Sequence, residues 1–318
     1  MTYAQNGSIQ ADDFNAFVGG NPTAVINTLN TVWATGGAGS GYGQTAVANV
    51  SVGGSIAASS WSDLVTKTSN CALHQGTSIT SVTAPTAGST ITYLSAIPSN
   101  LSAIYSNRLN AAAQGSTSAN TVSTTSTWTD KATWTHVVTF SSGDAARYFF
   151  NSGGQLKVTC SHPSGSGING LLHTLALDIG TIVISSPITG AITVSGVSYN
   201  GITKIGGGGN TPTIATNNGY YALTTSNANV FTQSTSIPYG YGYGSTAYVN
   251  VKLKSNGAQG LNGDSGSVVT IYTVWDEVPN GITVSSGSTT TVTAHFPETT
   301  YLGNTWGSVN IAGSVSVL

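Results

Sequence analysis

Residues 263–266 read Gly-Asp-Ser-Gly, the tetrapeptide that carries the nucleophilic serine in chymotrypsin-like proteases. That chemistry requires a histidine base, a buried aspartate and an oxyanion hole in one constellation. Four histidines precede the tetrapeptide: His74, His136, His162 and His173. None of them lies in an Ala-His-Cys context, and Asn-Gly-Asp is ordinary turn chemistry. We therefore predict a turn at residues 263–266, with no catalytic role.

Metal binding would need a group of His, Cys, Asp or Glu side chains at ligand spacing. His162, His173 and Asp178 are the closest such group, and their spacing fits no known ligand pattern. Asp12 and Asp13 are adjacent, so on a helix they would point in different directions, which favours a capping role over calcium binding. We predict no metal site, no cofactor and no catalytic residue.

Two further features have simple structural interpretations. Residues 206–210 read Gly-Gly-Gly-Gly-Asn but lack the following lysine and helix of a phosphate-binding loop, so a turn is expected. Cys71 and Cys160 show no metal-ligand or disulfide-framework spacing and are predicted to be two buried thiols.

Tyrosine and glycine alternate over residues 238–244, in a predicted loop. Phenol rings on a loop suit recognition of a sugar or a protein. The alternative is that Tyr239, Tyr241 and Tyr243 pack against a neighbouring subunit or the domain itself. We keep these tyrosines as candidate recognition or subunit-contact residues.

The composition limits the classes of partner. Only 6% of the 318 residues are charged and the formal net charge is −2, so a surface that tracks nucleic-acid phosphates is not expected. The sequence has no apolar run long enough to span a bilayer and no secretory signal, so we expect folding in the cytosol and no membrane insertion.

The elements that must position these residues differ along the chain. Apolar residues recur at helical spacing in three stretches of the first third: residues 24–33, 59–74 and 99–113. Residues 7–18 also align with residues 54–65, and each copy has an aromatic residue at its eighth position. We predict that residues 1–113 form an α+β docking region built from repeated units.

Residues 114–127 are small and polar, and we interpret them as a Ser/Thr-rich connection, or alternatively as an exposed edge segment. Beyond them the sequence alternates as strands around one short helix at residues 145–150. The predicted strands cover residues 135–140, 155–160, 181–185, 191–197, 220–225, 247–254, 267–275 and 289–296. Residues 248–253 and 268–274 are expected to form a hairpin. The predicted fold is α+β, with a mainly antiparallel β-sandwich over residues 128–318.

Several segments together resemble a family of tailed-phage virion structural proteins that is common in marine phages and cyanophages. They are residues 3–15, 41–44, 60–64 with 74–76, 146–155 and 296–302. The resemblance runs from near residue 3 to near residue 306 and is weakest over residues 181–245. It implies no enzymatic activity, so it assigns no catalytic residue.

Composition and resemblance together predict a non-enzymatic, tail-associated virion component: a fibre, tail-tip or baseplate protein for particle assembly and host attachment. We expect it to assemble in the host cytoplasm as a homo-oligomer such as a trimer, beside other virion proteins. In the released virion it would meet a host surface glycan or protein. The alternatives are a capsid decoration protein and a carbohydrate-binding adhesin module.

Overall fold

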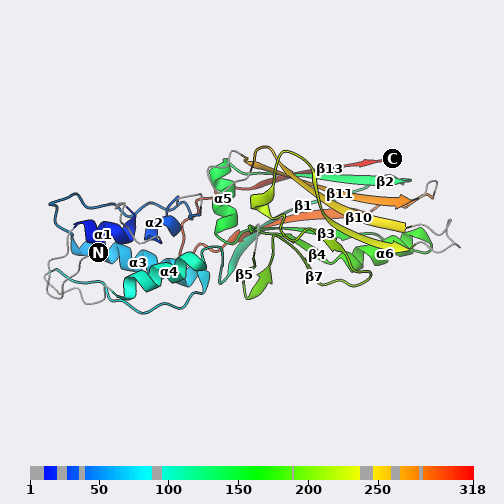
Figure 1. Cartoon of the computed structure of the whole chain (residues 1–318). Helices are drawn as coiled ribbons and strands as arrows, with labels where there is room; N and C mark the ends of the chain where they lie inside the picture. The colour runs from blue at the N-terminus through cyan, green and yellow to red at the C-terminus, as the bar shows by residue number, and fades with distance from the viewer. Residues whose placement is uncertain are drawn as a thin grey trace.

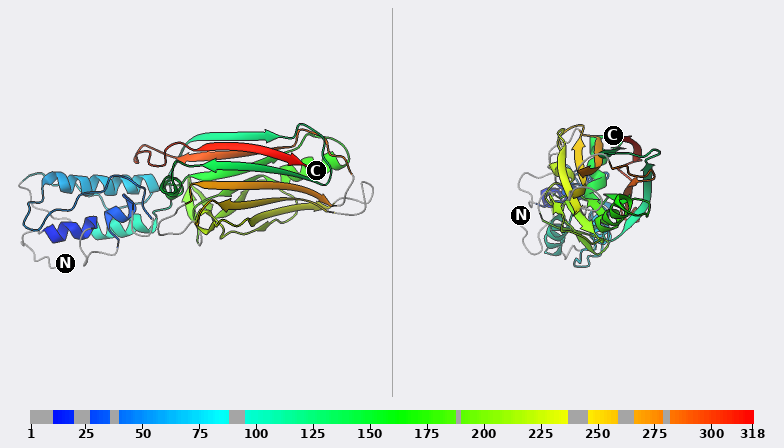
Figure 2. Two further views of the ribbon diagram at one scale, coloured as in Figure 1. Left: turned by 90° about the horizontal axis from the view of Figure 1, so that it is seen from above. Right: turned by 90° about the vertical axis from the view of Figure 1, so that its right-hand side faces the viewer.

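The molecule is elongated and has two parts arranged end to end, a helical part and a β-sandwich (Figures 1 and 2). The computed structural model describes residues 11–19, 27–35, 40–87, 95–187, 190–236, 246–258, 266–278 and 282–318. The predicted α+β fold with a mainly antiparallel sandwich is confirmed. The chain passes from the last helix of the helical part to the first strand of the sandwich between Ser106 and Gln114.

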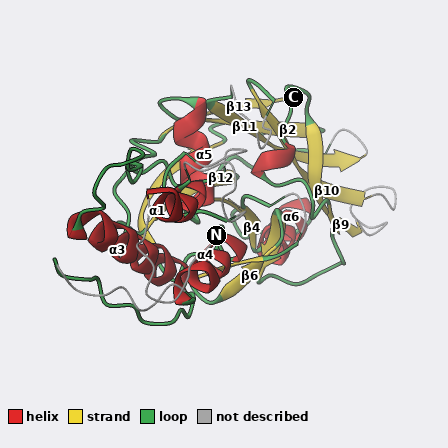
Figure 3. Cartoon of the chain, turned by 60° about the vertical axis from the view of Figure 1, so that its left-hand side comes forward, coloured by secondary structure: helices red, strands yellow, loops and turns green. Residues whose placement is uncertain are grey.

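Within its described residues, the helical part has four α-helices that bury their apolar stripes against one another. They are α1 (Ala11–Val18), α2 (Leu29–Val32), α3 (Ala58–Gln75) and α4 (Ala96–Ser106). The prediction for residues 59–74 is confirmed, whereas α4 begins earlier and ends earlier than predicted. Part of the predicted helix at 24–33 lies outside the described residues. Figure 3 views the molecule with these helices in front of the strands.

The internal repeat corresponds to two helices that touch. Ala11 and Ala58, at the same repeat position, are the first residues of α1 and α3. The aromatic residues in register, Phe14 and Trp61, are both buried and meet edge to face with ring centroids 5.3 Å apart. Such pairs contribute about 1 kcal/mol beyond the area they bury. The repeated aromatic position is therefore a core contact between the two copies.

Asparagine side chains hold the extended segments of the helical part in place. In each case the amide oxygen accepts from a backbone N–H and the amide nitrogen donates to the carbonyl of the same residue. The distances are 2.8–3.0 Å, in three pairs: Asn15 with Val50, Asn30 with Val47, and Asn100 with Thr80. These extended segments are therefore held in place by helices, and the described residues before 107 contain no strand.

The sandwich consists of two antiparallel sheets and a small hairpin. The five-stranded sheet has, in spatial order, β1 (Gln114–Ser123), β12 (Thr289–Pro297), β3 (Gln155–Ser161), β4 (Thr181–Ile184) and β7 (Ile202–Ile205). The six-stranded sheet has β13 (Asn310–Val317), β2 (Lys131–Thr139), β11 (Val268–Val278), β10 (Thr246–Ser255), β9 (Ala228–Ser236) and β8 (Thr213–Ile214). The hairpin pairs β5 (Ile192–Val194) with β6 (Val197–Tyr199).

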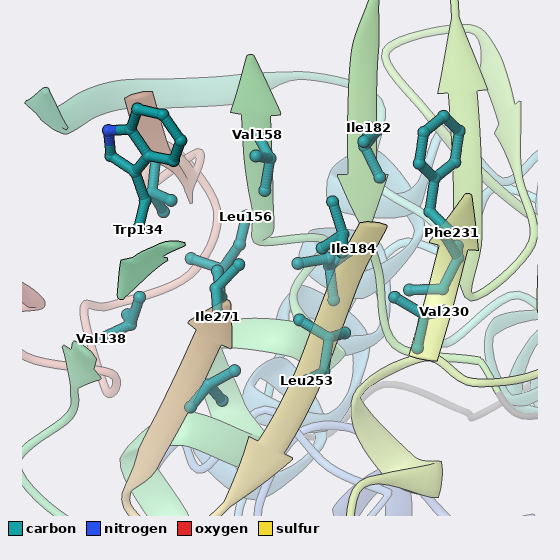
Figure 4. Close-up of a cluster of buried hydrophobic side chains, with 14 of the residues drawn as sticks. Trp134, Val138, Leu156, Val158, Ile182, Ile184, Val230, Phe231, Leu253 and Ile271 are labelled. Carbon is teal, nitrogen blue, oxygen red and sulfur yellow. The ribbon is translucent and has the colours of Figure 1, made fainter. Parts of the chain in front are cut away.

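The core lies between the two sheets because alternate side chains of each strand point inward. Strand β2 shows this most simply: its side chains alternate between half-buried and buried along nearly its whole length. Figure 4 shows Trp134, Val138 and Ile271 of the six-stranded sheet beside Leu156 and Val158 of the other sheet. Each fully buried aliphatic side chain of this kind stabilises the fold by about 2 kcal/mol.

Among the described residues, two α-helices accompany the sandwich, where the sequence predicted one. The predicted helix is α5 (Gly143–Asn151), whose N-cap Ser142 accepts from the backbone N–H of Ala145. The second helix, α6 (Ile168–Ile179), buries residues at helical spacing against β3 and β9. The sequence analysis missed α6 because the Gly- and Ser-rich residues before it are typical of a loop.

Residues 114–123 are a strand and not a connection, so the main interpretation of this segment was wrong and the alternative, an exposed edge segment, was correct. Strand β1 is the edge of its sheet and pairs with β12. The residues of β1 do not themselves indicate that β12 is their partner. One of its hydroxyls is paired with β12 as well: Thr121 and Thr291 share a hydrogen bond of 2.8 Å. The indole Nε1 of Trp134, from the other sheet, donates to the carbonyl of Val122 (3.0 Å).

The remaining strand predictions have mixed outcomes. The hairpin is confirmed, because β10 and β11 pair antiparallel over their whole lengths. Residues 220–225 are not a strand: Tyr220–Ala222 is a short 3-10 helix, η2, with the rings of Tyr220 and Tyr221 buried. Burial of both neighbouring rings does not fit the alternation of a half-buried strand.

Candidate functional site

The residues predicted at the protease-like turn and at the tyrosine loop cannot be placed. Residues 263–265 and 237–245, which include Tyr239, Tyr241 and Tyr243, lie outside the described residues. The tyrosine loop joins β9 to β10, whose ends Ser236 and Thr246 are paired in register. Both predictions stay predictions.

Of the three residues weighed as metal ligands, His162 and His173 are in contact in the structure, and Asp178 does not join them. His162 contacts the Ser288 hydroxyl through Nδ1 (2.8 Å) and the Asn169 amide oxygen through Nε2 (3.1 Å). His173 donates from Nδ1 to the carbonyl of His162 (2.7 Å). Both ring nitrogens of His162 are therefore engaged in hydrogen bonds. Within the described ranges, no three His, Cys, Asp or Glu side chains form a group that could hold a metal ion.

The cysteines, the aspartate pair and the glycine run considered in the sequence lie in places that need no functional explanation. Cys71 is buried and Cys160 half-buried, both are free, and burial raises the pKa of Cys160 to about 12. Asp12 and Asp13 lie in the first turn of α1, where the helix dipole favours negative charge. The glycine run after β7 is a turn whose Gly208 donates its N–H to the carbonyl of Asp178 (3.1 Å).

A dense polar network lies where the helical part meets the sandwich, and we call it the joint. It consists of residues 41–44, 74–75, 148–152, 221 and 302–305. The end of α3, the end of α5, η2 and the connection from β12 to β13 each supply part of it. Four of the segments quoted for the resemblance therefore contribute residues to the joint: 41–44, 74–76, 146–155 and 296–302.

Tyr42 is at the centre of the joint and is fully buried. Its hydroxyl donates to the carbonyl of Arg108 (2.7 Å) and accepts from Nε2 of Gln75 (2.8 Å). Its ring meets the imidazole of His74 edge to face, with centroids 5.3 Å apart. Burial, as the largest cause, holds the pKa of Tyr42 well above its usual value, so the phenol stays protonated.

Asn151 connects the helical part to the sandwich through both atoms of its amide. Its nitrogen donates to the carbonyl of Gly41 (2.9 Å), and its oxygen accepts a short hydrogen bond from the hydroxyl of Tyr221. Asn151 is fully buried, so each of these partners would lose its hydrogen bond in a dry environment if the amide were removed.

The connection between β12 and β13 closes the other side of the joint. Gln44 donates to the carbonyl of Gly303 (2.7 Å) and accepts from its N–H (3.0 Å). Thr305 donates from its hydroxyl to the carbonyl of Tyr42 (2.6 Å). The side chain of Leu302 belongs to the apolar core of the helical part. The two parts thus share both hydrogen bonds and core.

His74 is the residue of the joint whose side chain could act as a base, and its environment keeps the imidazole neutral. It donates from Nε2 to the carbonyl of Ser152 (3.2 Å). Burial lowers its pKa to about 4, although this hydrogen bond and the charge of Glu298 act in the opposite direction. An imidazole with this pKa is a weak base at neutral pH. The arrangement can hold two bodies together, but it does not pair a nucleophile with an activating base.

The buried histidines predict acid sensitivity. The folded-state pKa of His74 is about 4 against 6.5 for the free side chain, so the unfolded chain binds a proton first. The resulting stability is complete above pH 6.5 and is lost as the pH falls toward 4. We expect His74 alone to cost about 2 kcal/mol of unfolding free energy at pH 5. His136 and His295, whose pKa values burial also lowers to about 4, act in the same direction.

Urea denaturation at pH 7 and pH 5 measures this effect. The matched variant is His74→Gln, which can donate to the Ser152 carbonyl but does not titrate. Its loss of stability between the two pH values should be smaller than that of the parent chain by about 2 kcal/mol. An equal loss in both proteins would contradict a neutral buried His74.

The sequence did not point to the joint as a site. Residues 41–44 entered only through the resemblance, whereas His74 was also weighed as a catalytic base and residues 145–150 were also predicted to be a helix. Nothing in the sequence related these segments to one another. Tyr221 was assigned to a strand, and Gly303 and Thr305 were not considered. A signal was present only in the uncommon Gly-Tyr-Gly-Gln sequence, which has no periodicity to interpret.

Comparison of the chain with protein-family models, with curated proteins and with solved structures found no match in any of the three. Among the described residues, no helix has the length and apolar character needed to cross a membrane.

Proposed function

We propose that this chain is a non-enzymatic virion structural protein of a tailed phage. Its place is on the tail, as part of a fibre, the tail tip or the baseplate periphery, where it serves particle assembly and host attachment. The observation that carries the proposal is the joint. A shared core and paired amides connect the helical part to the sandwich, which gives an elongated body suited to bearing load between two attachment points.

The surface chemistry supports the same proposal. With 6% charged residues, contacts of this chain depend on shape and on short hydrogen bonds of hydroxyl and amide groups, which salt does not screen. An assembly subunit that must meet copies of itself and neighbouring proteins benefits from such contacts. We propose a homo-oligomer, with the helical part docked on the particle and the sandwich directed outward.

Mass spectrometry of purified particles tests this proposal. Particles from the lysate in which the chain is made should contain its peptides in a constant ratio to the major structural proteins. Antibody labelling should then place the chain at the tail, whereas label on the head would support the capsid-decoration alternative. Absence of the chain from washed particles would reject a virion role altogether.

A further inference from the structure

Among the described residues, two lysines on the outer face of the six-stranded sheet have no ion-pair partner. Strand β10 alternates, with Val251 and Leu253 in the core, so Lys252 and Lys254 both lie on the outer face. The ion pairs within the described residues involve Lys67, Lys131 and Arg147, and neither of these two lysines. This concentration is unusual in a chain that has eight basic residues in total.

The surroundings of the two lysines are aromatic and polar. Lys252 is directly opposite Tyr272 of β11, and the ammonium of Lys254 lies over the same ring, 5.6 Å from its centroid. Lys254 itself is opposite Thr270. On the other side of β10, Asn250 is opposite Thr232 of β9 and accepts a hydrogen bond of 2.6 Å from its hydroxyl. We call Lys252, Lys254, Tyr272, Asn250 and Thr232 the basic face.

No described helix covers the basic face (Figure 2). The strands that carry it face the viewer in the left panel of Figure 2, with no described helix in front of them. Helix α6 contacts this sheet at β9 and packs into the core, so it approaches from the inner side. Tyr272 and Asn250 are half-buried, as expected for side chains that stand on an uncovered sheet.

We infer that the basic face binds an anionic glycan, one that carries carboxylate or phosphate groups on its sugars. Two ammonium groups on neighbouring outward positions repel each other and are compensated by an anion. An aromatic ring beside amide and hydroxyl groups suits the apolar faces and hydroxyls of a sugar. The inference rests on the proposed function, because it gives host attachment a ligand class.

Two other occupants fit the basic face less well. A second copy of the chain whose two-fold axis passes through the basic face would place lysines against lysines without added anions. A nucleic acid needs a row of basic groups along its phosphates, and two lysines beside one tyrosine do not supply it. Charge complementarity therefore favours the anionic glycan.

Affinity electrophoresis of the full chain tests the inference, with polygalacturonate as the carboxylate probe and phosphomannan as the phosphate probe. We expect the chain to bind at least one of them, to bind neutral dextran much less, and to bind more weakly at 500 mM than at 50 mM NaCl. The double variant Lys252→Gln/Lys254→Gln should lose at least tenfold in affinity. The probe that retains binding identifies the anionic group.

The matched control is Lys67→Gln/Lys157→Gln, which changes the net charge equally but lies in α3 and in the other sheet. It should bind as the parent chain does, and thermal unfolding should show both double variants folded. No binding of either polyanion, equal losses in both double variants, or a preference for duplex DNA would overturn the inference. If the chain is present in particles but binds neither polyanion, the virion role still stands. If the chain binds a polyanion but is absent from particles, only the virion role is rejected.

Discussion

Replacing Gly43 by alanine is expected to destabilise the folded chain by about 3 kcal/mol. Gly43 has a φ of +72°, a conformation that alanine adopts at a cost of about 1 kcal/mol. In addition, a Cβ atom at this position would lie 2.4 Å from the ring of Tyr148, which α5 holds in the joint. The ring or the backbone of residues 41–44 must move, and the hydrogen bonds of Gly41, Tyr42 and Gln44 depend on that backbone.

Gly53→Ala is the matched control. Gly53 has a similar φ of +78°, but no atom lies within 4 Å of a Cβ built there. Urea denaturation should therefore show a loss of only about 1 kcal/mol for Gly53→Ala. The difference between the two variants measures the steric fit of the two parts. If both variants lost the same stability, Gly43 would be a backbone requirement without a role in the joint.

Replacing Asn151 by alanine is expected to cost about 3 kcal/mol of unfolding free energy. The substitution leaves the carbonyl of Gly41 and the hydroxyl of Tyr221 without the hydrogen bonds that the amide provides. Because Asn151 is fully buried, a cavity is added to this loss. Denaturation followed by both tryptophan fluorescence and circular dichroism should show the destabilisation.

A double-mutant cycle separates the two halves of this contact. Tyr221→Phe removes one of the two hydrogen bonds and should cost about 1 kcal/mol. In the Asn151→Ala background the same change should cost much less, since its partner is already gone. Fully additive effects would mean that Asn151 and Tyr221 contribute independently, and the continuous connection from Gly41 to Tyr221 would be wrong.

The joint has a physical consequence for the whole molecule. Interfaces between domains of one chain are often polar and allow relative motion. Here Leu302, from the sandwich side, is part of the core of the helical part, and Tyr42 is fully buried beside it in the same core. Opening the joint would expose apolar side chains and unpaired amides together, so we expect the two parts to behave as one body. Because protonation of His74 lowers the free energy of unfolding, we expect the joint to be less stable at acidic pH.

Elements whose information is local could be predicted from the sequence alone. Helix α3 and strands β2, β10 and β11 carry a regular apolar period, and the short-range hairpin of β10 and β11 followed from it. The neutral character of the surface and the free state of both cysteines were also readable, because they depend on composition and on single residues. The predicted burial holds for Cys71, whereas Cys160 is half-buried.

The meeting of partners that are far apart in the sequence depends on the folded chain. Strand β1 has a polar sequence that equally suits a linker, and it becomes a strand because β12, about 170 residues later, supplies its hydrogen bonds. The pairing of Gln44 with Gly303 and of Asn151 with Gly41 is likewise invisible in the chain order. Amide and hydroxyl groups bind any suitable partner, so their types do not specify which one. The packing of the apolar cores brings those groups into contact, and this packing is a property of the folded chain.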